Sequence, residues 1–306
     1  GDAEVPGVAG ETLAERLLDL LGEPLPPRPE PSCGVAARPV AVDSRLGGTY
    51  ELGPHRLVCG DGTDPAALDL ALGGAAPALV ATDPPYQVGY TGRRGGRIMA
   101  GKDWRALYHE APVPYDLLPR FVAAVAPRAA PTAVWYVWHG VRQIPTLIAA
   151  FEATGLLHHQ LVVWRKPMVV FGHALWHHQH ELCSVGWRRG AFPGGPRQPR
   201  LLDADFTRGD VWDADWDGAH KSPDLGHPTS KPLELWRRPL AAHVPPGGLV
   251  LDSFGGSGTA LIAAAQTGRR AALVELEPVF CDVIRRRWTA FATSQGEAPG
   301  PGALAP

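Results

Sequence analysis

The sequence predicts an α/β protein built on a doubly wound, mostly parallel sheet. Short apolar runs that end in an acidic residue recur at 78–83, 249–252 and 271–275. These strand-like runs alternate with stretches of helical apolar spacing, which favours parallel strands joined by helices. A glycine-rich turn at 254–258 leads from one run into a predicted helix, as in sheets that bind ligands at the carboxyl ends of their strands.

The chain divides into a peripheral segment, one main domain and a tail. In residues 1–45, Glu11–Leu21 has leucines at helical spacing, and Pro24–Pro29 is a proline-rich run typical of an extended linker. Residues 46–292 carry the alternating pattern of the main domain. The Gly-, Pro- and Ala-rich tail at 293–306 is expected to be disordered.

The elements of the main domain follow from the local pattern of apolar and turn residues. After a turn at Gly53–Pro54, strands are predicted through Leu57 and Val58 and at Ala78–Thr82, Thr132–Trp138, Leu157–Trp164, Glu181–Trp187, Leu249–Asp252 and Ala271–Val274, because β-branched, aromatic and other apolar residues form short runs there. Helices are predicted at Ala66–Leu72, Tyr115–Ala126, Arg142–Ala153 and Ala260–Ala265, where apolar spacing is helical or alanine predominates. Two glycine-rich stretches, Gly89–Lys102 and Gly190–Gly226, are predicted to be loops.

Composition narrows the class of protein. A chain of 306 residues with 45% hydrophobic residues can bury a full core. Its apolar runs are too short to span a bilayer and it opens with no basic-then-apolar leader, so a cytoplasmic protein without a membrane partner is expected. The scattered cysteines at 33, 59, 183 and 281 and the crowded histidines at 173, 177, 178 and 180 are interpreted as buried thiols and a polar strand or loop, so no metal site is predicted.

The tetrapeptide Asp83-Pro84-Pro85-Tyr86 is the most informative motif. A nucleobase amino group is a poor nucleophile, because its lone pair is delocalised into the ring. Methylating it requires acceptors that hold both N–H bonds out of the ring plane. Asp83 supplies a carboxylate, and the stiff Pro84-Pro85 backbone can aim the Pro84 carbonyl at the same amine. Tyr86 offers a flat face for an extruded base, although an ordinary Asp-Pro turn is the simpler interpretation of the motif by itself.

A second motif predicts the cofactor. The strand Leu249–Asp252 enters the glycine-rich turn, and the helix that follows offers free N–H groups at its start. Leu261 stands where a dinucleotide fingerprint needs its third glycine, and the Gly-Lys-Ser/Thr of a phosphate-binding loop is absent. Glu275, at the end of the next strand, can accept hydrogen bonds from ribose hydroxyls. A nucleoside pocket without a pyrophosphate site fits S-adenosyl-L-methionine and not NAD.

Together these motifs resemble those of the amino-group DNA methyltransferases of the β arrangement, most closely phage- and prophage-type modification methylases, over about residues 46–291. The resemblance implies a Rossmann-like methyltransferase sheet with a circularly permuted motif order, since the catalytic tetrapeptide precedes the cofactor loop. It implies that Asp83, Pro84, Pro85 and Tyr86 are catalytic. Gln87 departs from the family, in which Asn often follows the tetrapeptide, and this puts no catalytic group in doubt.

The resemblance also implies a set of cofactor-binding residues. Gly60-Asp61 resembles the strand end whose carboxylate meets the adenine of the cofactor, and 227–232 resembles a His-Pro-x-x-Lys-Pro helix start that contacts its methionine end. The full set is Asp61, Asp83, His227, Thr229, Ser230, Lys231, Asp252, Phe254, Gly255, Gly256, Ser257, Gly258, Thr259 and Glu275. We expect the strands carrying Asp61, Asp83 and Glu275 to be neighbours, so that one crevice holds cofactor and target base.

Basic residues predict where double-stranded DNA lies. The net charge is only −2, but cations cluster at Arg93, Arg94, Arg97 and Lys102 and again at Arg188, Arg189, Arg197 and Arg200, and both clusters are predicted to contact phosphates. The segment 190–226 is predicted to recognise the target sequence. Trp104, Trp212 and Trp216 are candidates for base stacking or for structural plugs. Further candidate partners are a second copy of the chain and a cognate restriction endonuclease.

Several functions remain as alternatives. Asp at the first catalytic position favours adenine N6, since Ser is commoner there among cytosine-N4 enzymes, but a carboxylate does not exclude cytosine. Methyltransferases of RNA or protein amides typically place the cofactor loop first and Asn at the start of the tetrapeptide, which is the reverse of this chain. A catalytically inactive DNA-binding relic would have a broken motif, and both motifs are intact.

Overall fold

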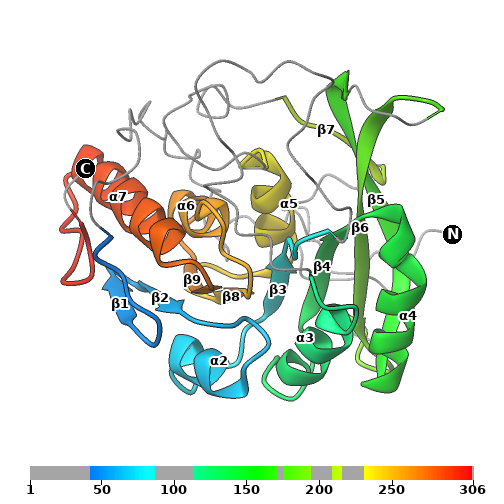
Figure 1. Ribbon diagram of the computed structural model, residues 1–306, viewed down its shortest axis with the longest axis horizontal. Coiled ribbons are helices and arrows are strands. Elements are labelled where there is room, and N and C mark those ends of the chain that lie inside the picture. Colours follow the sequence, from blue (N-terminus) through cyan, green and yellow to red (C-terminus); the bar gives the residue numbers. More distant parts are fainter. Residues whose placement is uncertain (1–41, 87–112, 171–174, 194–208, 216–230, 305–306) are drawn as a thin grey trace, which may run out of the picture.

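The computed structural model describes residues 42–86, 113–170, 175–193, 209–215 and 231–304. They form a nine-stranded sheet with helices on both faces (Figure 1). The strands are β1 (Thr49–Leu52), β2 (His55–Cys59), β3 (Leu79–Thr82), β4 (Val134–His139), β5 (Leu156–Val170), β6 (His178–Arg188), β7 (Val211–Asp213), β8 (Leu249–Asp252) and β9 (Arg270–Glu275). The helices are α2 (Pro65–Leu72), α3 (Leu117–Val125), η1 (Val141–Gln143), α4 (Ile144–Ala153), α5 (Glu234–His243), α6 (Thr259–Gln266) and α7 (Pro278–Ser294).

The sheet confirms the doubly wound, permuted fold. Its strand order is β1-β2-β9-β8-β3-β4-β6-β5-β7. The five strands from β2 to β4 in this order are parallel, whereas β1 and β6 run antiparallel to their neighbours β2 and β4. Strands from the end of the chain, β8 and β9, therefore lie between β2 and β3 from its first third. The chain leaves β8 towards β9 and leaves β3 towards β4, so the topological switch point lies between β8 and β3.

Two hydrophobic layers hold the helices against the sheet. Helices α5, α6 and α7 cover one face with residues such as Leu240, Leu261 and Ile284. Helices α2, α3 and α4 cover the other face, as Figure 1 shows, with Leu68, Phe121 and similar residues. The central strand β3 is completely buried between these layers, at 0–1% exposure for all four residues. Burial on both faces explains why it reads as a continuous apolar run.

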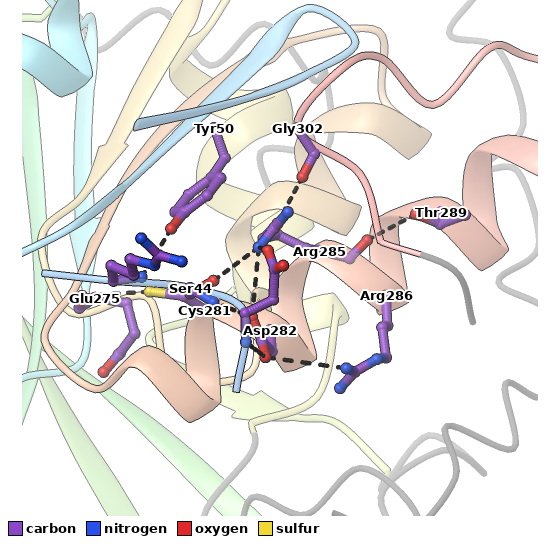
Figure 2. A network of polar contacts seen from close by, with 11 residues as sticks. Ser44, Tyr50, Glu275, Cys281, Asp282, Arg285, Arg286, Thr289 and Gly302 are labelled. Carbon is purple, nitrogen blue, oxygen red and sulfur yellow. Dashed lines mark hydrogen bonds and ion pairs between the residues drawn. The ribbon is translucent and has the colours of Figure 1, made fainter. Parts of the chain in front are cut away.

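Helix α7 ties the two ends of the described chain to the core. Buried Arg285 donates to the Gly302 carbonyl at 2.6 Å and pairs with Asp43 at 2.6 Å, while Asp282 accepts from the backbone of Asp43 and Ser44 (Figure 2). Gly302 in turn donates its N–H to β1, at the Glu51 carbonyl. The expectation of disorder from residue 293 is therefore wrong: α7 runs through Ser294, the Pro299 carbonyl accepts from Trp288, and Gly302 donates to β1. The Gly-, Pro- and Ala-rich composition of this segment suggested disorder, because composition does not reveal these long-range contacts.

The β5–β6 hairpin is longer than predicted. The two strands pair from Leu156 and Arg188 as far as Val170 and His178, well past the predicted ends near 164 and 181. Because β6 is antiparallel to β4, the hairpin extends beyond the edge where β3 and β4 end, as its tall arm in Figure 1 shows. Near its tip the side chains of Leu175 and Trp176 are exposed.

Within the predicted recognition segment 190–226, residues 209–215 supply a strand that sequence reasoning missed. This short strand, β7, pairs in parallel with β5. Trp212 is buried and stacks on Tyr136 with 6.1 Å between ring centroids, so it is a structural plug. Trp104, Trp216 and most of the segment lie outside the described residues. No helix in the described part of the chain has the length and apolar character needed to cross a bilayer.

Candidate active site

The catalytic tetrapeptide lies where the sheet predicts a ligand site. β3 ends at Thr82, and Asp83 follows directly at the carboxyl edge shared with β8 and β4. Pro84 is buried and Pro85 is exposed, so the stiff pair passes from the core to the surface within two residues. The side chain of Asp83 is 21% exposed, which leaves it accessible at the edge of the core.

Asp83 belongs to a compact group of four charged side chains. Its Oδ2 atom pairs with Nζ of Lys231, which also lies 3.0 Å from Oε2 of Glu181. Oε1 of Glu181 pairs with Nζ of Lys166 at 2.7 Å. Two carboxylates and two ammonium groups thus share a largely buried space and balance in charge, which is the condition for burying such groups without a large desolvation penalty.

The two oxygens of Asp83 differ. Oδ1 is buried and receives no hydrogen bond from the residues that the structure describes. A buried acceptor without a donor is costly unless a ligand supplies one. Burial raises the pKa of Asp83, the Lys231 cation opposes that rise, and the Glu181 carboxylate adds to it. The open acceptor therefore sits on a carboxylate whose charge depends on its neighbours.

Tyr86 is fixed by the same group. Its hydroxyl donates to Oε2 of Glu181 at 3.1 Å and accepts from Nζ of Lys231 at 3.1 Å. The Lys231 ammonium also lies 5.2 Å from the centroid of its ring. Burial and the two nearby carboxylates raise the pKa of the Tyr86 hydroxyl well above its ordinary value, so it stays protonated as a donor. Stacking of this ring on a base remains a prediction.

The glycine-rich turn is joined to the catalytic strand through Asp252. Its Oδ1 accepts from the Thr82 hydroxyl at 2.6 Å and from the Phe254 N–H at 3.1 Å. Burial raises the pKa of Asp252 to about 7. Gly256 and Gly258 have φ of +53° and +80°, a region that disfavours side chains, and Gly258 directly precedes α6. Phe254 packs its ring on Phe121 rather than towards solvent.

Two hydroxyls predicted to bind cofactor contact a buried arginine instead. Ser257 and Thr259 lie within 3.3–3.4 Å of Nη1 of Arg287, which also donates to the Ser257 carbonyl at 3.0 Å. Arg287 comes from α7 and is 1% exposed. These contacts hold the glycine-rich turn against α7. If Ser257 or Thr259 binds the cofactor, we expect the contact to come from its backbone.

Glu275 ends β9 beside the turn. Its two oxygens accept from the Gly256 N–H at 2.7 Å and the Glu277 N–H at 2.9 Å. Burial raises the pKa of Glu275 to about 7, since only backbone N–H groups oppose it. The Gly60 N–H donates to the Glu275 carbonyl, so the strand before Asp61 is its direct neighbour. The expected order is confirmed for Asp61 and Glu275, while Asp83 lies two strands from Glu275 because β8 intervenes.

Asp61 follows β2 at the same carboxyl edge of the sheet as Glu275. Its Oδ1 accepts from the N–H and the hydroxyl of Thr63, both at 2.8 Å, and its Oδ2 lies 3.3 Å from Arg120. Gly62, next to it, packs so tightly that a Cβ would meet the Ser253 carbonyl. The Ser253 hydroxyl is buried and has no partner among the described residues. Gly62 and Ser253 were not predicted, because their importance depends on the contact between two distant turns.

The structure describes two of the arginines that were predicted to contact DNA, Arg188 and Arg189. β6 runs antiparallel to β4, with Trp187 opposite Val134 and Leu182 opposite His139. Arg188 and Arg189 therefore lie at the edge of the sheet where β4 begins, whereas Asp83 lies at the edge where β3 and β4 end. Arg188 donates to the Ala126 carbonyl at 3.1 Å. Contact of these two arginines with DNA stays a prediction. His227, Thr229, Ser230, Arg93, Arg94, Arg97, Lys102, Arg197 and Arg200 lie outside the described residues.

Sequence reasoning assigned no role to Glu181 or Lys166. Their proximity depends on strand pairing that places Trp164 opposite Glu181. Among the described residues, no group of three His, Cys, Asp or Glu side chains is placed to hold a metal ion.

Comparison with known proteins decides the family. Residues 78–286 match the model of the family N6_N4_Mtase, described as DNA methylase. The chain belongs to this DNA methylase family. The methylase is 28% identical over 203 residues to YubD of Escherichia coli (strain K12), whose name describes it provisionally as a methylase; the match covers 66% of this chain and 78% of YubD.

Solved structures agree with the fold of the methylase. TTHA0409 of Thermus thermophilus, in complex with S-adenosyl-L-methionine, has a TM-score of 0.52 and 25% identity, with 77% of this chain and 95% of that chain covered. The cytosine-N4-specific PvuII DNA methyltransferase has a TM-score of 0.52 and 14% identity, with 82% and 97% covered, and supports the fold alone.

The family fixes the reaction class. The methylase transfers a methyl group from S-adenosyl-L-methionine to an exocyclic amine of DNA, at N6 of adenine or N4 of cytosine. Its residues fit this cofactor, because the Ser253 hydroxyl, next to the glycine-rich turn, is buried without a partner among the described residues.

Proposed function

We propose that the chain methylates N6 of adenine in specific sequences of double-stranded DNA, on a base extruded from the helix. The observation that carries the proposal is the open, buried Oδ1 atom of Asp83 beside the anchored Tyr86 ring. An amine N–H is the donor that this acceptor lacks. Asp at this position favours adenine by family resemblance, and the motif order supports membership of the β arrangement.

The residues divide the work between two ends of one crevice. Asp83 accepts an N–H of the amine and draws the nitrogen lone pair out of conjugation, while Tyr86 supports the base. Glu275, Asp61 and the backbone of 254–258 would hold S-adenosyl-L-methionine, which supplies an electrophilic methyl group. The short link from Asp252 through the Thr82 hydroxyl fixes the two ends relative to each other. Rigid spacing of this kind is what an in-line transfer requires.

Nucleoside analysis tests the proposal. The purified chain is incubated with unmodified double-stranded DNA and S-adenosyl-L-methionine carrying a deuterated methyl group, and the DNA is digested and examined by mass spectrometry. We expect deuterated N6-methyldeoxyadenosine, absent with Asp83→Ala. Deuterated N4-methyldeoxycytidine would show that the target is cytosine N4, the other amine on which this family acts. Label in RNA or protein but not in DNA would overturn it.

Sequence specificity and partners need separate measurements. Sequencing that detects modified bases on the treated DNA is expected to find methylation confined to one short sequence. Gly190–Gly226 is proposed to choose that sequence, and exchange of this segment with that of a relative should change the sequence methylated. A second copy of the chain and a cognate endonuclease remain predictions, tested by sedimentation and by co-purification.

A further inference from the structure

Lys231 lies on the base side of the site, although the sequence motif assigns it to the cofactor. Its ammonium contacts Asp83 Oδ2, Glu181 Oε2 at 3.0 Å and the Tyr86 hydroxyl at 3.1 Å. An ammonium has three N–H donors, and these three acceptors account for all of them. The residue is 6% exposed, and its cation lies between the Tyr86 and Trp138 rings at 5.2 and 5.5 Å from their centroids. No donor remains for the cofactor.

Glu181 anchors this ammonium to the sheet. It lies on β6 and pairs through Oε1 with Lys166 on the adjacent strand β5. Its other oxygen receives both Lys231 and the Tyr86 hydroxyl. Burial raises the pKa of Glu181, but the two lysines outweigh it and hold the pKa at about 2. Glu181 is therefore a permanent anion on rigid backbone, suited to fixing the groups that bind it.

The consequence falls on the acceptor atom of Asp83. With Oδ2 held by Lys231, the carboxylate cannot rotate freely, and Oδ1 keeps one direction. Asp83 must also be ionised, because a protonated carboxyl would be a poorer acceptor for an amine. The charged and titratable groups that act on Asp83 are Lys231, Glu181 and Tyr86, together with buried Asp252 on β8 and Cys183 on β6. Lys231 is the cation among them.

We propose that Lys231 and Glu181 are positioning residues that act through Asp83: Lys231 orients the carboxylate and keeps it ionised, and Glu181 holds Lys231 and the Tyr86 hydroxyl in place. This inference rests on the proposed function of Asp83 as the acceptor of the target amine. It assigns Lys231 to the binding of the target base instead of the cofactor. It also gives a role to Glu181, to which the sequence assigned none.

The two residues have opposite charges, so their removal should have opposite effects on pH dependence. Lys231→Met removes the cation that lowers the pKa of Asp83, so the acidic limb of the kcat/KM profile for DNA should move to higher pH by about one unit or more. Glu181→Gln removes an anion that raises this pKa, so the limb should move to lower pH. Lys231→Arg keeps the charge and should leave the limb in place while kcat falls. In all three, calorimetry should show cofactor affinity within a few-fold of the parent.

The outcomes separate this inference from the proposed function. Limbs of Lys231→Met and Glu181→Gln that coincide with the parent would overturn the inference, as would a tenfold loss of cofactor affinity in folded Lys231→Met. If Lys231→Met fails to fold by circular dichroism, the nearly isosteric Glu181→Gln still decides, because loss of the anion that acts on Asp83 moves its limb downward, whereas a merely structural role for Glu181 would leave the limb in place. Full activity of Asp83→Ala would instead refute the proposed function, whatever the limbs do.

Discussion

Glu181 at the base end of the site and the carboxylates at the cofactor end are buried among different partners. At the base end, Lys231 and Lys166 hold the pKa of Glu181 at about 2 although burial alone would raise it. At the cofactor end, Asp252 and Glu275 meet backbone N–H groups and one hydroxyl, and burial raises both pKa values to about 7. A cation keeps a carboxylate charged at every physiological pH, whereas neutral donors leave it free to titrate. Glu181 at the base end is thus permanently charged, whereas Asp252 and Glu275 at the cofactor end can titrate near neutral pH.

The largest effect should come from breaking the base end at its centre. Asp83→Ala removes the acceptor that acts on the amine, so turnover should fall by about 10²–10³-fold or more. The residue lies two strands from Glu275, so cofactor affinity should stay within a few-fold. Asp83→Asn, which keeps the shape but not the charge, is the matched variant and should also be nearly inactive. Tritium transfer and calorimetry measure the two quantities, and retained turnover would remove Asp83 from its role.

Breaking the cofactor end should weaken binding rather than chemistry. Glu275→Ala deletes an acceptor for the ribose and leaves the Gly256 and Glu277 N–H groups without theirs. The expected loss of affinity is about 1.5–3 kcal/mol, with kcat at saturating cofactor changed only a few-fold. Glu277→Ala is the control, because its backbone N–H remains and its side chain caps no helix. Equal losses in both variants would show a general charge effect instead.

The cofactor end also predicts a pH dependence. With a pKa of about 7 in the free protein, Glu275 is protonated below that pH and must lose its proton to accept fully from ribose hydroxyls. Cofactor affinity should therefore rise between pH 6 and 8, by at most about tenfold per unit, with proton release on binding at the lower pH. Glu275→Gln should flatten the dependence. If Asp252→Asn flattens it instead, the titrating group is Asp252.

The parallel core and its motifs were predictable because they are local. Buried strands such as β3 and β8 read as apolar runs, and their terminal carboxylates follow directly in sequence. What the sequence did not reveal depends on pairing between distant segments. The Glu181–Lys231 contact joins β6 to the start of the last quarter of the chain, and the contact of Arg287 with the Ser257 carbonyl joins α7 to the glycine-rich turn. The same limit applies to Arg188, because a cluster of arginines in the sequence does not show at which edge of the sheet an antiparallel strand places them.

The two arginine clusters extend the comparison from single residues to the two edges of the sheet at which β3 and β4 begin and end. Arg188 and Arg189 lie across the sheet from Asp83, whereas Arg93, Arg94 and Arg97 follow the tetrapeptide closely in sequence. DNA that delivers a base to Asp83 must approach the carboxyl edge of β3. The cluster at Arg93, Arg94 and Arg97 is therefore expected to contact the phosphates near the target base, and it should do so without regard to sequence.

Alanine at Arg93, Arg94 and Arg97 should weaken binding to all DNA sequences alike. The slope of log affinity against log salt should decrease by about one unit for each arginine that contacts a phosphate. The matched double variant Arg188→Ala/Arg189→Ala removes cations of the same kind from the opposite edge, so its slope should equal that of the parent. Thermal unfolding of the double variant controls for the lost hydrogen bond from Arg188 to Ala126. If the double variant flattens the slope and the triple one does not, DNA lies along the edge where β4 begins, and the base would have to reach Asp83 across the sheet.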